Sequence, residues 1–149
     1  ISVIVIICDQ LSKWLIVAFL SMGNAVRLLP FLNFDLVYNR GAAFSFLSTE
    51  GGWQVFFLMA MSLAITGLLV YWLAKTPASF RWQSVALALI IGGALGNLID
   101  RVRLHKVVDF IDFHINRWHF ATFNVADMAV SIGVFILILC LFFYTENQS

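Results

Sequence analysis

Two aspartates, Asp109 and Asp127, lie at the borders of long apolar segments in a chain that carries few charges. A carboxylate near hydrocarbon is costly unless it is paired, hydrated or protonated, so such acids usually mark a pathway, a proton relay or an active site. If the two carboxyls come within hydrogen-bond reach, one must keep a proton, because like charges cannot both ionise there. The ionised group can then activate water while the protonated group polarises a scissile carbonyl. The spacing alone also permits two ordinary interfacial acids.

The composition predicts an integral membrane protein. Of the 149 residues, 62% are hydrophobic and 11% are charged. The net charge of +1 argues against a nucleic-acid partner. Cys8 and Cys140 fall inside apolar runs, where a free cysteine behaves as a small hydrophobe, so we expect packing roles for both.

Four apolar runs are each close to the roughly 20 residues that cross a bilayer core. They cover about residues 1–20, 53–74, 82–99 and 124–144. The chain is therefore expected to be an all-α membrane protein with four transmembrane helices in a single domain, 1–149. Pro77 breaks the helical pattern in the short connector 75–81.

The two long connectors, 21–52 and 100–123, are expected on the same side of the membrane, and they hold most of the charge. Polar and apolar residues alternate from Leu32 to Asn39, which predicts a strand. A second short run from Ala42 to Leu47 follows, so we expect a small surface sheet. The segment Val107 to Phe113 is predicted to fold back over the mouth of the helix bundle.

The positive charges point to an orientation that conflicts with the function inferred below. The connector 75–81 holds two Lys or Arg residues, whereas the two long connectors hold six. By the positive-inside rule, the long connectors would face the cytoplasm.

Asp9 and Lys13 are spaced i, i+4 in the first apolar run, so the two side chains share a helix face. They are predicted to neutralise each other, either as a structural pair or to help position a lipid-linked substrate. Ser12 diverges from Lys13 by roughly 100° around the helix, which argues against a Ser-Lys protease dyad.

The third run ends in a glycine stripe and a polar face. Gly92 and Gly96 have the small-xxx-small spacing that lets another helix approach closely. Asn97, Asp100 and Arg101 recur at i, i+3 and i+4, which aligns them at the exit of the span. Asp100 and Arg101 are predicted to form an organising ion pair, because arginine would hold the acid ionised.

The fourth run begins with Asn124, which is predicted to cap the helix and to orient Asp127. Asn124, Asp127 and Ser131 share one helix face. Asp109 is the natural partner for Asp127, which makes these two acids the predicted dyad.

Metal and serine protease chemistry are disfavoured. His105, His114 and His119 are spaced by nine and five, so no HExxH-like helical pair occurs. We expect no metal, although Asp112, His114 and His119 are the residues to check. Ser45 follows no nucleophile motif, and the GxGD motif of another aspartyl protease class is absent.

A small four-helix transporter is the alternative function. A transporter tends to place its key ionisable group near the bilayer midplane, whereas Asp109 and Asp127 lie at one end of the spans. A membrane assembly subunit would explain the glycine stripe but would leave the two acids unexplained.

The chain resembles the bacterial lipoprotein signal peptidases (signal peptidase II) in five blocks that occur in the same order. They are Asp9-Gln10-Leu11-Ser12-Lys13, Asn39-Arg40-Gly41-Ala42-Ala43-Phe44-Ser45, Gly92 to Arg101, Val107-Val108-Asp109-Phe110 and Phe123-Asn124-Val125-Ala126-Asp127. The segment Arg117-Trp118-His119-Phe120 departs from the pattern and leaves the specificity of that region open.

The resemblance implies four transmembrane helices with both termini cytoplasmic, and an extracytoplasmic β-cradle with an interfacial helix. It places the catalytic dyad on Asp109 and Asp127, with no cofactor. The residues implied in substrate binding or dyad support are Asp9, Lys13, Asn39, Gly41, Asn97, Asp100, Arg101 and Asn124.

The implied substrate is a prolipoprotein whose cysteine already carries diacylglycerol, and the cut falls on the N-terminal side of that cysteine. The implied partners are therefore the lipidated signal peptide and membrane lipid. We expect a monomer in the bacterial cytoplasmic (inner) membrane, with its active site facing the extracytoplasmic side.

Overall fold

A computed structural model describes residues 1–41, 53–115 and 118–146. Its four helices are α1 (Ser2–Phe19), α2 (Trp53–Lys75), α3 (Arg81–Leu104) and α4 (Val125–Glu146). All four are long and apolar enough to cross a membrane, which confirms the predicted spans. The strands are β1 (Val26–Leu29), β2 (Leu32–Asn39), β3 (Val107–Ile115) and β4 (Trp118–His119).

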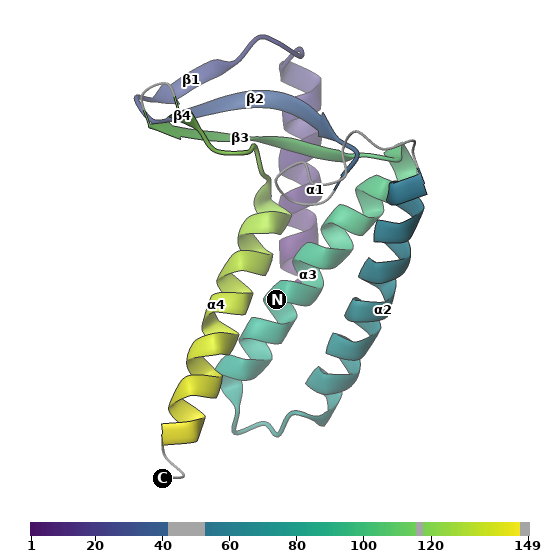
Figure 1. Ribbon diagram of the computed structural model, residues 1–149, viewed down its shortest axis with the longest axis vertical. Helices are drawn as coiled ribbons and strands as arrows, with labels where there is room; N and C mark the ends of the chain where they lie inside the picture. The colour runs from purple at the N-terminus through teal and green to yellow at the C-terminus, as the bar shows by residue number, and fades with distance from the viewer. Residues whose placement is uncertain (42–52, 116–117, 147–149) are drawn as a thin grey trace.

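The helices form a bundle, and the sheet lies across one end of it (Figure 1). The connector between α2 and α3 lies at the opposite end, together with the C-terminus. The described parts of both long connectors therefore lie at the same end, as predicted. Helix α3 is the centre of the bundle, because α1, α2 and α4 all pack against it.

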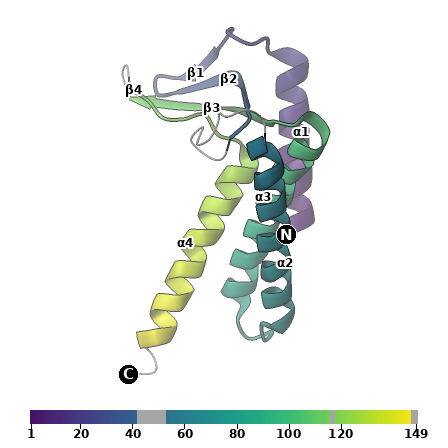
Figure 2. The ribbon, with the colours of Figure 1, turned by 45° about the vertical axis from the view of Figure 1, so that its right-hand side comes forward.

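The sheet is antiparallel, with strand order β1-β2-β3-β4. The predicted strand 32–39 is confirmed as β2, and the segment predicted to fold back over the bundle is strand β3. Its far end, with β4, extends beyond α4 (Figure 2). The predicted run from Ala42 to Leu47 lies outside the described residues. The described parts of the two long connectors contain no helix matching the implied interfacial one.

Helix α3 approaches its neighbours closely along its glycines. A Cβ atom on Gly92 would lie 2.9 Å from the Ser2 carbonyl oxygen of α1, and one on Gly93 would overlap the Ala126 carbonyl of α4. The predicted close approach at the glycine stripe is confirmed, and it brings the N-terminal part of α4 against the second half of α3.

A small apolar core joins α1 to the sheet. It contains the buried residues Ile16, Leu36, Val108 and Phe110. Successive side chains of a strand point to opposite faces, so Val108 and Phe110 face this core while Asp109 faces the other way. The core thus fixes the direction in which Asp109 points.

Candidate active site

Asn124 connects the two predicted catalytic acids. Its side-chain Nδ2 donates a hydrogen bond to Asp109 Oδ1 at 2.7 Å, and its backbone N–H donates to Asp127 Oδ2 at 3.3 Å. Asn124 is fully buried and Asp109 is 2% exposed. The structure therefore brings together two acids that are 18 residues apart in the chain, from strand β3 and helix α4.

Asp127 is held by a capping box at the start of α4. The Asp127 N–H donates to Asn124 Oδ1 at 2.9 Å, while the Asp127 carboxylate accepts from the Asn124 N–H. This reciprocal pair satisfies two of the backbone donors that a helix N-terminus leaves free. The predicted capping role of Asn124 is confirmed. The other Asp127 oxygen accepts a hydrogen bond from Asn97 Nδ2 at 2.8 Å.

Asp109 is held from the strand side. Asn39 Nδ2 donates to Asp109 Oδ2 at 3.2 Å, and Asn39 Oδ1 accepts the N–H of Gly41 at 2.8 Å. The guanidinium of Arg101 in turn donates to the Gly41 carbonyl at 3.2 Å. These contacts connect the end of β2 to both β3 and α3.

Burial, and to a smaller extent the nearby charge of Asp127, raise the pKa of Asp109, which comes to about 7. Hydrogen bonds from Asn39 and Asn124 and the charge of Lys13 act in the opposite direction, because each favours the ionised carboxylate. Near neutral pH, Asp109 therefore exists in both protonation states, as a shared proton requires.

A buried lysine orients the groups behind the dyad. Lys13 Nζ lies 2.8 Å from Asp9 Oδ2 and 2.8 Å from Asp100 Oδ2, and it donates to Asn97 Oδ1 at 3.0 Å. The predicted pairing of Asp9 with Lys13 is confirmed. Because an ammonium can only donate, Lys13 holds the oxygen of the Asn97 amide and leaves its nitrogen to face Asp127.

The predicted ion pair between Asp100 and Arg101 is wrong. In the described parts of the chain, Asp100 pairs with Lys13 and accepts the Val108 N–H at 3.1 Å, whereas Arg101 reaches Gly41. Consecutive helix residues point about 100° apart, so the two side chains reach different neighbours.

Two contacts of the site were not anticipated from the sequence. Asp9 Oδ1 accepts the N–H of Ala126 at 2.9 Å, so an acid of α1 caps the first turn of α4. Gln10 Nε2 donates to Asp100 Oδ1 at 2.9 Å and to the Gly96 carbonyl at 3.2 Å. Gln10 belongs to the first resemblance block, and that block was the one sequence signal that could have indicated it.

A cavity of about 820 Å³ lies beside the dyad, between α2 and α4. We call it the dyad cavity. Its lining is mostly apolar, with the polar side chains of Asn97, Arg101 and Asp127 among it. The apolar and aromatic residues that line it are Leu58, Met61, Ile65, Phe113, Phe120, Ala121, Phe123, Met128, Val130 and Ile132.

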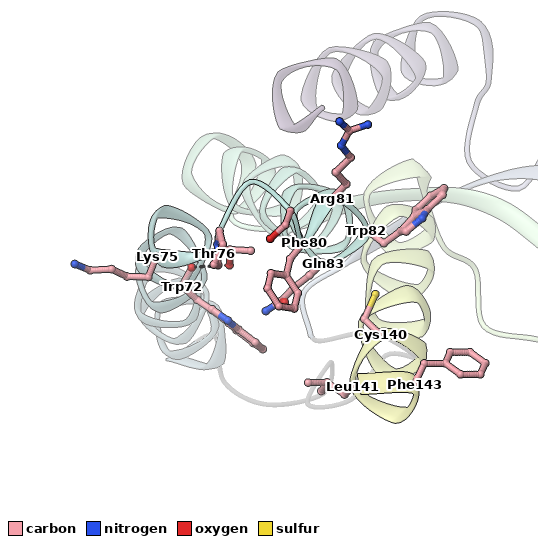
Figure 3. A pocket seen from close by; sticks show the side chains of 12 residues that line it. Trp72, Lys75, Thr76, Phe80, Arg81, Trp82, Gln83, Cys140, Leu141 and Phe143 are labelled. Atoms are coloured by element: carbon pink, nitrogen blue, oxygen red, sulfur yellow. Dashed lines mark hydrogen bonds between the residues drawn. The ribbon is translucent and has the colours of Figure 1, made fainter. Parts of the chain in front are cut away.

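A second cavity, of about 620 Å³, lies at the other end of the bundle. Trp72 of α2 and Leu141 of α4 extend into it from opposite sides, and Lys75 points away from it (Figure 3). No residue of the predicted site lines this cavity. The dyad cavity is therefore the candidate active site.

Asp112, His114 and His119 also come together, on the sheet. The Nδ1 atom of His119 lies 2.9 Å from both Asp112 oxygens, and the two histidine rings stack with centroids 4.8 Å apart. Within residues 1–41, 53–115 and 118–146, however, no group of His, Cys, Asp and Glu side chains is arranged to hold a metal ion.

Comparison with known proteins agrees with this architecture. A solved structure described as a bacterial membrane enzyme is 37% identical and superposes with a TM-score of 0.90, covering 99% of this chain and 88% of its own. A lipoprotein signal peptidase of Coxiella burnetii (strain Dugway 5J108-111) is 60% identical over 93% of this chain and 85% of the relative. One of Hydrogenovibrio crunogenus is 51% identical over 93% of this chain and 80% of the relative.

The family model described as signal peptidase (SPase) II matches residues 1–143. That match covers α1, α2, α3, most of α4 and both acids of the dyad, and it favours a peptidase over a transporter. The chain belongs to the signal peptidase II family and is a multi-pass membrane enzyme.

Proposed function

We propose that the protein is an aspartyl endopeptidase that removes the signal peptide from prolipoproteins whose cysteine carries diacylglycerol. The cut falls on the N-terminal side of that cysteine. The observation that carries this proposal is the bridge by Asn124 between Asp109 and Asp127, beside an apolar cavity. The relatives named lipoprotein signal peptidases support the class of substrate.

In the proposed reaction, the ionised aspartate takes a proton from water, and the water oxygen attacks the scissile carbonyl carbon. The protonated aspartate donates its proton to the carbonyl oxygen, which gives a tetrahedral intermediate. When that intermediate collapses, the amine of the lipidated cysteine leaves with a proton from the dyad. The Asp109 pKa of about 7 supports this scheme, since both protonation states are accessible near neutral pH.

The dyad cavity suits an apolar signal peptide. Its walls are side chains of α2 and α4, and Asp127 lies among them. A peptide held between these helices would present its cleavage site to the dyad while the acyl chains remain in lipid. The substrate thus needs no passage through the closely packed contact between α3 and α4.

The remaining predicted site residues are proposed to support the dyad. Asn97 and Asn124 orient Asp127, and Asn39 orients Asp109. Four further residues hold these amides and the helix ends in place, through the contacts described above. They are Asp9, Lys13, Gly41 and Asp100. Arg101, which lines the dyad cavity and contacts Gly41, is proposed to bind substrate carbonyl groups.

We place the enzyme in the bacterial cytoplasmic membrane as a monomer, with the sheet end on the extracytoplasmic side. The count of positive charges opposes this orientation. Cysteine accessibility tests it: Cys8→Ser and Cys140→Ser remove the two free thiols, and Asp35→Cys in β2 should then react with an impermeant maleimide in intact cells. Labelling only after the cells are opened would reverse the orientation.

The activity test compares a diacylglyceryl-modified prolipoprotein with its unlipidated form in a gel-shift assay. Chelator is present throughout, and the wild type is run beside Asp109→Asn and Asp127→Asn. We expect cleavage of the lipidated form alone, and no cleavage by either variant. If folded wild-type protein cleaves neither form, the proposed function is wrong.

A further inference from the structure

The hairpin of β3 and β4 supplies part of the wall of the dyad cavity. Phe113 of β3 and Phe120, which follows β4, both line it, as does Asp127. The two rings have centroids 5.6 Å apart, and the Phe120 N–H donates to the Phe113 carbonyl at 2.9 Å. We call Phe113 and Phe120 the aromatic wall. It borders the space in which the substrate would be cut.

Asp112 and His119, which contact each other, each directly precede one phenylalanine of the aromatic wall in the sequence. Asp112 precedes Phe113, His119 precedes Phe120, and His119 Nδ1 lies 2.9 Å from both Asp112 oxygens. An ionised carboxylate only accepts hydrogen bonds, so Nδ1 carries the hydrogen and donates it. Asn33 Nδ2 also donates to Asp112 Oδ2, at 3.0 Å, which anchors the carboxylate to β2.

Strand β4 is short. It is two residues long and, within the described residues, pairs with β3 through His114↔His119 and Ile115↔Trp118, with the bond from the Phe120 N–H to Phe113 just beyond it. So short a strand is marginal unless side chains fix it. The stacking of His119 on the buried His114 ring adds a second side-chain contact.

We propose that Asp112 and His119 form a clamp that positions the aromatic wall and thereby sets how tightly substrate binds. The inference rests on the function proposed above. Neither residue lines the dyad cavity, so both act through the phenylalanines and are positioning residues. His119 and Phe120 belong to the segment that lies outside the five resemblance blocks.

Two substitutions at His119 separate the hydrogen bond from the bulk of the side chain. His119→Leu keeps a side chain of similar bulk but removes the donor, and His119→Asn places an amide N–H near the position of Nδ1. The His119 side chain is 52% exposed, so neither change should disturb folding, and thermal unfolding checks this.

We expect His119→Leu to raise the KM for lipidated prolipoprotein about fivefold, as the loss of one hydrogen bond would, with little change in kcat. His119→Asn should return KM to near the wild-type value. An unchanged KM in the leucine variant, or a fall in kcat at constant KM, would overturn the clamp.

A binding assay keeps the clamp separate from catalysis. The same two substitutions are placed in an Asp127→Asn background, and the Kd for a fluorescent diacylglyceryl signal peptide is measured. We expect about a fivefold weaker Kd with leucine and near-parental binding with asparagine. Equal Kd values would overturn the clamp. If the wild type shows no cleavage while the variants show the expected Kd pattern, that result would support the clamp and contradict only the proposed function.

Discussion

The two acids of the dyad are held by different kinds of structure. Asp127 belongs to a helix end, where a capping box and the amide of Asn97 fix it, and behind that amide lies the buried Lys13. Asp109 belongs to a strand, and its donors come from Asn39 and Asn124. We call Asp127 and its support the helix half of the site, and Asp109 and its support the strand half. Buried charges stabilise the helix half, whereas neutral amides hold the strand half. This difference predicts that damage to the first will affect stability, and damage to the second will affect the protonation of the dyad.

The strongest test removes one acid from each half. Asp109→Asn and Asp127→Asn should each lower the cleavage rate by a factor of about 10²–10⁴, because Asn can neither ionise nor carry the shared proton. The rate is measured with lipidated prolipoprotein, and folding by thermal unfolding.

Asp35→Asn in β2 is the control and should retain activity, because Asp35 does not line the dyad cavity and the described hydrogen bonds of Asp109 and Asp127 go to other residues. If either dyad variant unfolds, that acid has a structural role and the comparison between the two halves fails.

The next test breaks the helix half. Lys13→Met leaves the buried carboxylates of Asp9 and Asp100 facing each other without their cation. We expect the free energy of unfolding to fall by about 3–5 kcal/mol. Denaturant unfolding in detergent measures it, with Lys75→Met at the opposite end of the bundle as a control that should change little. Equal stability of the two variants would contradict a buried ionic support.

A substitution in the strand half should instead change the pH profile. The Asp109 pKa is raised to about 7, so the dyad loses its shared proton and activity falls as the pH rises through that value. Asn39→Leu removes a donor that favours the ionised carboxylate, so the Asp109 pKa should rise and the alkaline limb should move to higher pH. Activity should also fall about tenfold. An alkaline limb of the pH profile at the same pH as in the wild type would show that Asn39 does not affect the Asp109 pKa.

The smallest expected effect lies at the edge of the strand half. Both ring nitrogens of the buried His114 lack a hydrogen-bond partner among the residues that the structure describes. His114→Phe keeps a ring to stack on His119 and removes those nitrogens, so the free energy of unfolding should rise by about 1 kcal/mol. Thermal unfolding with KM measured alongside checks this. A lower stability would mean that the nitrogens have a partner that only the intact protein in its membrane supplies.

The helix half could be predicted from the sequence more fully than the strand half. The four spans, the pairing of Asp9 with Lys13 and the capping role of Asn124 follow from helical spacing, which is a local property. Spacing alone leaves the pairing of Asp109 with Asp127 as one possibility among others. The family resemblance is what singled out this pair. Local sequence patterns could not predict which side chains of different elements pair. Asp100 pairs with Lys13 rather than with Arg101, and Asp112 contacts His119 because β3 and β4 form a hairpin.

The contact between Asp9 and the Ala126 N–H has a consequence for how the enzyme matures. The first turn of α4, which carries Asp127, is capped by the carboxylate of Asp9. The ribosome adds Asp9 to the chain more than a hundred residues before Ala126. The last span can complete its N-terminus only by docking onto the first span inside the membrane. A nascent chain therefore completes this end of α4 only after the first and the last span have met.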